Sequence, residues 1–174
     1  MEIKTKILSS DIIYVGGGNT LKMMRRWRFL GVDKLLKIAW EKGIVLCGVS
    51  AGSICWYESG HSDSMSYYNP NHWDYINVKG LGFIKGIHCP HYDSATLGVK
   101  RKSKFQNMMQ KIDGFGIAIQ DNCAIEYIND KFRVLTSKPH AKAFKVYKQH
   151  GTIIETEIEK SVRLIRLSQL YTKE

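Results

Sequence analysis

The chain has 174 residues, of which 44% are hydrophobic and 24% charged, and its net charge at pH 7 is +10. This length suits one globular domain with a sizeable core, and we expect residues 1–174 to form a single domain. The basic residues are spread along the chain without a nucleic-acid-binding motif, so no nucleic-acid partner is expected. No apolar run approaches the ~20 residues of a membrane span, so no membrane association is expected either.

The N-terminal sequence and the cysteines predict a cytoplasmic protein. The first residues, "MEIKTKILSSDII", lack the apolar core and cleavage site of a secretory signal. The four cysteines form no CxxC pair and are expected to be buried free thiols, not metal ligands or disulfides. They are Cys47, Cys55, Cys89 and Cys123. We expect no metal and no cofactor.

The first half of the chain alternates strands and helices. Apolar runs and helical periodicity predict, in chain order, a strand within 11–20, a helical segment over 21–42 broken near Gly31, a strand at 44–47 and a short helix that ends near Glu58. Residues 59–77 are polar, aromatic and rich in turn formers. A segment of this length and composition is expected to be a functional loop.

The second half is dominated by strands. The pattern predicts a strand within 82–92, a helix over 100–112, strands at 115–120, 123–128, 131–136, 141–147 and 152–158, and a short helix or strand within 160–173. Strands that alternate with helices and then continue as hairpins indicate an α/β fold. We expect a mostly parallel sheet with C-terminal antiparallel hairpins.

The stretch "KGIVLCGVSAGSICW", residues 42–56, contains the clearest functional signal. An apolar strand runs into Gly-x-Ser-x-Gly and continues as a helix. Such a sharp turn presents one hydroxyl to a substrate, which makes Ser50 the candidate nucleophile. The N–H of Ala51, at the start of the helix, is a candidate donor to the oxyanion of acyl transfer.

Three glycines, residues 16–18, end the first predicted strand. Glycine lets the backbone approach a ligand closely, so this turn is a candidate for the second oxyanion donor. The sequence "GGGNT" fits neither the dinucleotide-binding nor the P-loop pattern.

A serine nucleophile needs a histidine base and usually an acid that orients the histidine. The chain has six histidines, and His91 is favoured because it follows a predicted strand end, as Ser50 does. Asp121 follows a third strand end and is the favoured acid. Asp63 and Asp74, in the long loop, are its rivals.

A second order of catalytic residues can also be written. Ser50, Asp121 and His140 would follow the serine, acid, histidine order of α/β-hydrolases. We rank it second because "TSKPHAK" is typical of a hairpin turn.

Four segments together resemble one family. "YVGGGNT", "GVSAGS", "HCPHYD" and "IAIQDNCAI", in this order, are similar to the peptidase E family, which comprises alpha-aspartyl dipeptidases and, more distantly, cyanophycinases. The resemblance covers roughly residues 8–150. It implies a flavodoxin-like sheet related to class I glutamine amidotransferases, with Ser50 as nucleophile and His91 as general base.

The resemblance also implies roles for further residues. Asp121 stands where the family's dipeptidases usually have glutamate, and Asp63 is the closest match to an acidic residue that follows the nucleophile. Gly18, beside Gly17, matches the family's glycine-rich turn near the oxyanion. Arg101 follows His91 by ten residues, in a helix where the family has an arginine, and could hold a substrate carboxylate.

Family members usually begin with strands and helices well before the glycine-rich strand, which here starts at residue 11. We therefore expect a sheet that lacks the usual N-terminal strands, and a chain that either forms a homo-oligomer or is marginally stable. The predicted function is a serine peptidase that hydrolyses small peptides, especially dipeptides with an N-terminal aspartate. The alternative is an inactive truncated remnant that serves as a binding or structural protein.

Overall fold

The computed structural model describes residues 3–173. The chain divides into two compact units, Met1–Lys85 and Gly86–Glu174. Among the described residues, no helix is long and apolar enough to cross a bilayer. The single-domain organisation stays a prediction.

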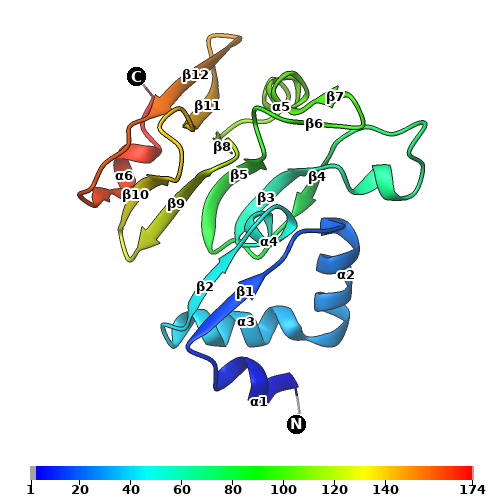
Figure 1. Cartoon of the computed structure of the whole chain (residues 1–174), viewed down its shortest axis with the longest axis vertical. Coiled ribbons are helices and arrows are strands. Elements are labelled where there is room, and N and C mark those ends of the chain that lie inside the picture. The colour runs from blue at the N-terminus through cyan, green and yellow to red at the C-terminus, as the bar shows by residue number, and fades with distance from the viewer. Residues whose placement is uncertain (1–2, 174) are drawn as a thin grey trace. The chain divides into compact units, whose positions relative to one another are not determined.

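The N-terminal unit is built on two adjacent parallel strands, and the chain between them forms two helices (Figure 1). After helix α1 (Ile3–Leu8), strand β1 (Ile12–Val15) pairs with β2 (Val45–Gly48). Helices α2 (Thr20–Leu30) and α3 (Val32–Glu41) connect them. The predicted break between the helices is confirmed, because Gly31 has φ 71° and its N–H donates to the last carbonyls of α2.

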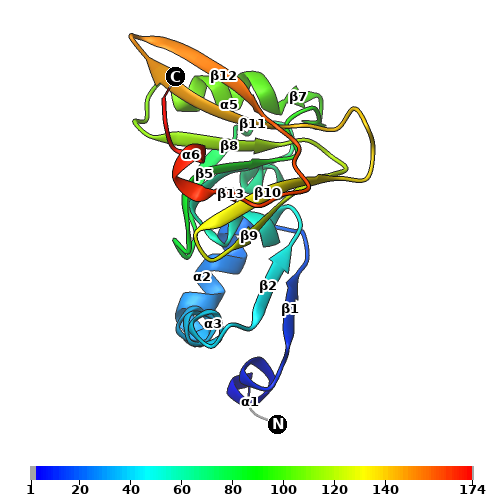
Figure 2. The ribbon, with the colours of Figure 1, turned by 90° about the vertical axis from the view of Figure 1, so that its left-hand side faces the viewer.

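The two faces of the β1–β2 pair differ. Figure 2 shows α2 and α3 on one side of both strands. The buried residues that pack together on that side are Val15, Met24, Leu36, Cys55, Trp56 and Val78. On the other face Ile12, Tyr14 and Val45 are 62%, 66% and 55% exposed. Self-association of the chain stays a prediction.

The segment predicted as a long loop contains a strand pair. Helix α4 (Ala51–Ile54) ends earlier than expected, and β3 (Tyr57–Ser62) pairs antiparallel with β4 (Ile76–Lys79). Only residues between them form a loop, which begins with the short 3-10 helix η1 (Ser64–Tyr67). The prediction failed because "YESGHS" has no apolar alternation, whereas in the structure its polar residues His61 and Ser62 are buried.

The C-terminal unit contains strands in the order β12-β11-β8-β5. Strand β5 (Ile84–Pro90), which begins at the boundary between the units, is parallel to β8 (Phe115–Ile119). Strands β11 (Ala143–Gln149) and β12 (Thr152–Ile158) continue the sheet as an antiparallel hairpin. Helix α5 (Arg101–Met109) packs on this sheet through Phe105 and Met109. All these elements were predicted.

A smaller antiparallel sheet follows the order β13-β10-β9. It contains β9 (Cys123–Ile128), β10 (Lys131–Thr136) and β13 (Ile165–Arg166), and α6 (Leu167–Leu170) follows it. The C-terminal segment thus holds both a short strand and a short helix. The small hairpin of β6 (Ala95–Thr96) and β7 (Val99–Lys100) was not predicted. Parallel pairs with antiparallel additions confirm the α/β class.

All four cysteines are free thiols, as predicted. Cys55 and Cys89 are buried, whereas Cys47 and Cys123 are only partly buried, which corrects the expectation for those two. Burial raises the pKa of Cys89 to about 12 and that of Cys123 to about 11. Thiols with such pKa values are poor nucleophiles at neutral pH.

Candidate active site

Ser50 lies between β2 and α4 in a backbone conformation that side chains rarely adopt. Its φ is 58° and its ψ is −118°. The carbonyl oxygen of Ser50 accepts hydrogen bonds from the N–H groups of Ser53 and Ile54, so the helix begins directly at this residue. A non-glycine residue in such a conformation costs on the order of 1–3 kcal/mol and persists only where its surroundings enforce it.

The two glycines of the Gly-x-Ser-x-Gly motif are required by close packing. A Cβ added to Gly52 would lie 2.0 Å from the carbonyl oxygen of Val15, at the end of β1. A Cβ added to Gly48 would lie 2.3 Å from the carbonyl oxygen of Gly52. The turn therefore fits against β1 only when both positions lack a side chain.

We expect Gly52→Ala to destabilise the chain by about 3 kcal/mol, because the added methyl group meets backbone that cannot rotate away. Urea denaturation measures the change. Gly16→Ala is the matched control, since a Cβ there meets nothing within 4 Å. Equal midpoints for the two variants would mean that the turn is not packed as described.

The glycine-rich turn after β1 lies against Ser50. A Cβ added to Gly17 would lie 3.3 Å from Ser50 Cβ and 3.8 Å from Ser50 Oγ. Gly18, the next residue, has φ 142°. Ala51 is buried and is the first residue of α4. Its N–H therefore takes part in none of the hydrogen bonds within the helix. The backbone donors predicted for the oxyanion thus lie next to the serine.

Hydrogen bonds from the long loop hold the glycine-rich turn in place. Asn19 caps α2, accepting from Lys22 N–H at 2.9 Å, and donates to the carbonyl oxygen of Ser64 at 3.2 Å. Ser64 Oγ accepts from Leu21 N–H at 3.0 Å. Asp63, one of the predicted acids, directly precedes Ser64, so it belongs to the same unit as Ser50.

In the C-terminal unit, His91 and Asp121 are in direct contact. His91 Nδ1 lies 2.6 Å from Asp121 Oδ1, and the side chains are 28% and 47% exposed. An ionised carboxylate can only accept, so Nδ1 carries the proton and Nε2 is left to act as a base. The hydrogen bond with His91 is the largest influence that lowers the pKa of Asp121. Asp121 therefore stays ionised at neutral pH.

Two residues that the sequence analysis missed hold Asp121. Ser94 Oγ donates to Asp121 Oδ2 at 2.8 Å, and Asp93 Oδ1 accepts from Asp121 N–H at 3.1 Å. The backbone N–H of Ser94 also donates to the carbonyl oxygen of His91. The signal was the pair of polar residues, Asp93 and Ser94, two and three positions after His91. These hydrogen bonds hold the side chain of Asp121, which is shorter than the glutamate that the family's dipeptidases usually have.

The other candidate residues have different surroundings. His88 is buried and its Nδ1 donates to Ile117 O at 2.9 Å, and burial lowers its pKa to about 4. His140 is exposed in a turn, as predicted. Asp74 Oδ1 accepts from the N–H of the next residue, Tyr75. Among the predicted acids, Asp121 is the one for which the structure has a hydrogen bond to His91.

Arg101 is 4% exposed, although its sequence neighbours Lys100 and Lys102 are also charged. Its N–H donates to Ser94 O at 3.1 Å, and its Nη2 lies 3.3 Å from Thr96 Oγ1. Ser94 thus links the two residues, because its carbonyl oxygen accepts from Arg101 N–H and its own N–H donates to the carbonyl oxygen of His91. The charge of Arg101 also contributes, behind the hydrogen bond with His91, to the lowered pKa of Asp121.

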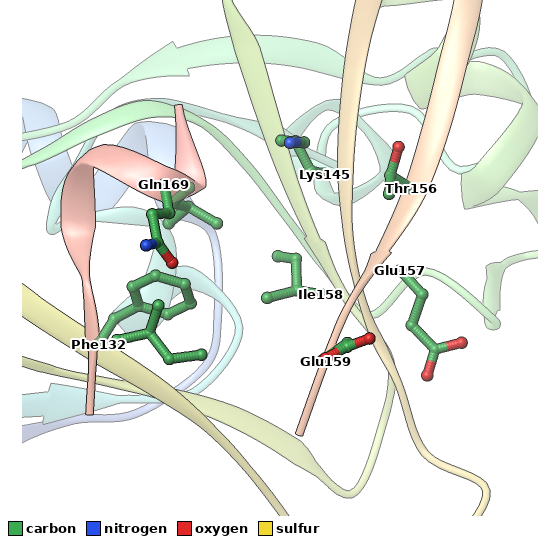
Figure 3. Close-up of a pocket in the computed structure, with 9 residues that line it drawn as sticks. Phe132, Lys145, Thr156, Glu157, Ile158, Glu159 and Gln169 are labelled. Atoms are coloured by element: carbon green, nitrogen blue, oxygen red, sulfur yellow. The ribbon is translucent and has the colours of Figure 1, made fainter. Parts of the chain in front are cut away.

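No cluster of three or more histidine, cysteine, aspartate or glutamate residues within 3–173 could hold a metal ion. A pocket of about 130 Å³ lies in the C-terminal unit, and Figure 3 shows Lys145, Ile158 and Gln169 around it. None of the candidate catalytic residues lines this pocket. It is therefore not the proposed site.

Comparison with known proteins identifies the family. A family model described as peptidase family S51 matches residues 1–135. The chain belongs to this family. It is 37% identical over 150 residues to the uncharacterized peptidase YgaJ of Bacillus subtilis, an alignment that covers 86% of this chain and 61% of that protein.

A second relative is the uncharacterized peptidase Lmo0363 of Listeria monocytogenes, 28% identical over 116 residues, which are 64% of this chain and 50% of that protein. The chain thus spans between half and about three-fifths of the length of these curated relatives. Membership of family S51 confirms the predicted resemblance to peptidase E. Residues after 135 lie outside the family match.

Proposed function

We propose that the chain is a serine peptidase that hydrolyses small peptides, especially dipeptides with an N-terminal aspartate, through an acyl-enzyme on Ser50. The observation that carries the proposal is the positive φ of Ser50 at a strand-to-helix turn, which is the arrangement of a nucleophile elbow. The family match and the peptidase names of both relatives support the same reaction class.

The proposed reaction begins when Ser50 Oγ attacks the carbonyl carbon of the peptide bond and His91 Nε2 accepts its proton. Asp121 accepts from Nδ1–H and stabilises the imidazolium that forms. The N–H of Ala51 and the turn at Gly17 donate to the oxyanion. His91 then protonates the leaving amine, and water hydrolyses the ester. The mechanism requires Ser50 Oγ to come within hydrogen-bonding reach of His91 Nε2 in the active protein.

The fold that we propose for this reaction is flavodoxin-like and related to class I glutamine amidotransferases. It is supported by the positions of Ser50 and His91, which each follow the carboxyl end of a parallel strand. Asp63 and Gly18 are proposed as further residues of the site. The four free cysteines fit a reducing compartment, and we propose the cytoplasm.

The local geometry favours an enzyme over an inactive remnant that only binds a partner. Ser50 and His91 are both non-glycine residues with positive φ, at 58° and 130°. Each conformation costs stability, and strain of this kind is concentrated at functional sites. The hydrogen bonds that orient Asp121 are also in place.

We propose that the guanidinium of Arg101 binds the β-carboxylate of the substrate. Hydrogen bonds to a charged group are worth about 1.5–3 kcal/mol, or roughly 10- to 150-fold in affinity. Arg101→Met should therefore lower kcat/KM for Asp-Leu roughly 10- to 150-fold and change that for Asn-Leu, which is nearly isosteric but uncharged, by less than about threefold.

Steady-state hydrolysis of the two dipeptides measures this preference. Lys104→Met, which removes a cation from the same helix, should leave the ratio of the two kcat/KM values unchanged. An equal loss with both substrates in Arg101→Met would assign Arg101 a structural role. Absence of hydrolysis of either dipeptide by the unmodified chain would contradict the proposed function itself.

A further inference from the structure

Glu155, on β12, accepts hydrogen bonds from side chains of two other segments. Tyr92 Oη donates to Glu155 Oε2 at 2.6 Å, Lys102 Nζ to Oε1 at 2.6 Å and Gln106 Nε2 to Oε2 at 2.9 Å. Tyr92 follows His91 directly, and the other two donors belong to α5. Burial, and then the hydrogen bond to Glu155, raises the pKa of Tyr92, so its hydroxyl remains a donor.

The ring of Tyr92 is fixed as firmly as its hydroxyl. Tyr92 is 1% exposed and packs edge-on against Phe105, with ring centroids 6.0 Å apart. Its ring also packs against the tilted ring of Phe144, with centroids 5.6 Å apart. Lys102 Nζ lies 5.4 Å from the Tyr92 ring centroid. The backbone N–H of Tyr92 donates to Ile119 O at 3.2 Å. Tyr92 is therefore anchored at the backbone, the ring and the hydroxyl.

This anchor lies next to a strained residue. His91 has φ 130°, a value that side chains rarely adopt, and such strain persists only where neighbouring contacts over-determine it. His91 and Tyr92 share a peptide bond, so rotation of the His91 backbone must displace the Tyr92 side chain. Because the Tyr92 ring is packed and its hydroxyl bonded, that displacement is opposed.

We propose that Glu155 is a positioning residue of the active site, which acts through Tyr92 to hold His91 in its strained conformation. The inference rests on the proposed function, in which His91 is the general base. It assigns a role to the C-terminal hairpin, since Glu155 lies beyond residues 1–135 that match the family. Glu155 touches no reacting atom, and its effect on hydrolysis passes through the geometry of His91.

Two variants and a matched control test the proposal. Tyr92→Phe removes only the hydroxyl and leaves Glu155 with its other two donors, and Glu155→Gln removes the charge. Each should lower kcat roughly tenfold, with KM within about twofold of its original value, because substrate contacts are unchanged. The control is Glu157→Gln, which removes a carboxylate on the same strand that accepts from Lys142 Nζ at 2.6 Å. It should leave kcat unchanged.

A second measurement needs no substrate. NMR of imidazole-labelled histidine follows the Nδ1 proton between His91 and Asp121, assigned by its loss in His91→Ala. This resonance should shift or broaden in Tyr92→Phe and Glu155→Gln and stay unchanged in Glu157→Gln. All spectra and rates are measured at a temperature well below the thermal unfolding midpoint of each variant.

The two measurements separate the possible failures. If the unmodified chain hydrolyses dipeptides, an unchanged kcat or an unchanged resonance in Tyr92→Phe overturns the proposal, even where the unfolding midpoint falls. If it hydrolyses none, the proposed function fails, and the resonance alone decides whether Glu155 positions His91.

Discussion

Replacement of Ser50 by glycine is expected to stabilise the folded chain while it abolishes hydrolysis. At φ 58° and ψ −118°, serine carries strain of about 1–3 kcal/mol that glycine does not. Glycine loses more backbone entropy on folding than other residues do, which offsets about 0.5–1 kcal/mol of this gain. The net stabilisation should be about 1 kcal/mol, read from urea denaturation. Without the nucleophile, kcat should fall at least about 10⁴-fold.

Ser50→Ala is the matched control, because alanine removes the hydroxyl but retains Cβ and therefore the strain. It should lose hydrolysis to the same extent without gaining stability. If Ser50→Gly and Ser50→Ala had the same midpoint, the strain at residue 50 would be absent. If either variant retained hydrolysis, another residue would be the nucleophile.

The second large effect is expected at His91. Loss of a general base typically lowers the rate about 10²–10⁴-fold. His91→Ala should therefore lower kcat/KM for a dipeptide by a factor in this range. His140→Ala tests the rival order of catalytic residues. His140 is exposed in a turn, and its replacement should change kcat/KM by less than about twofold.

The same assay shows which order holds. A large loss in His140→Ala with little loss in His91→Ala would move the chain to the serine, acid, histidine order. Comparable losses in both would mean that neither histidine is the base by itself. Circular dichroism of each variant confirms that the compared proteins are folded.

Short-range features of this chain could be predicted from the sequence. The strand, turn and helix around Ser50 depend on an apolar run and on two glycines within five residues, so the sequence alone contains the signal. The helix break at Gly31 is local in the same way, since only a residue that tolerates a positive φ ends α2 there. Apolar alternation likewise predicted the C-terminal strands.

Features that depend on partners far along the chain could not be predicted. Strand β3 has no apolar alternation and exists because β4 pairs with it. Ser94 and Asp121 are 27 residues apart, and Tyr92 and Glu155 are 63 apart, so neither hydrogen bond has a local pattern. Lysines surround Arg101 in the sequence, and only the fold reveals that its side chain is buried.

The pairing of Ser50 with His91 is the central claim, and covalent labelling tests it most directly. A small alkyl fluorophosphonate reacts with a serine only when a base activates its hydroxyl. Mass spectrometry of the digested protein should map a single adduct to Ser50, and the labelling rate should fall roughly 100-fold in His91→Ala but not in His140→Ala. An adduct on another residue, or labelling of His91→Ala at the unmodified rate, would contradict the account.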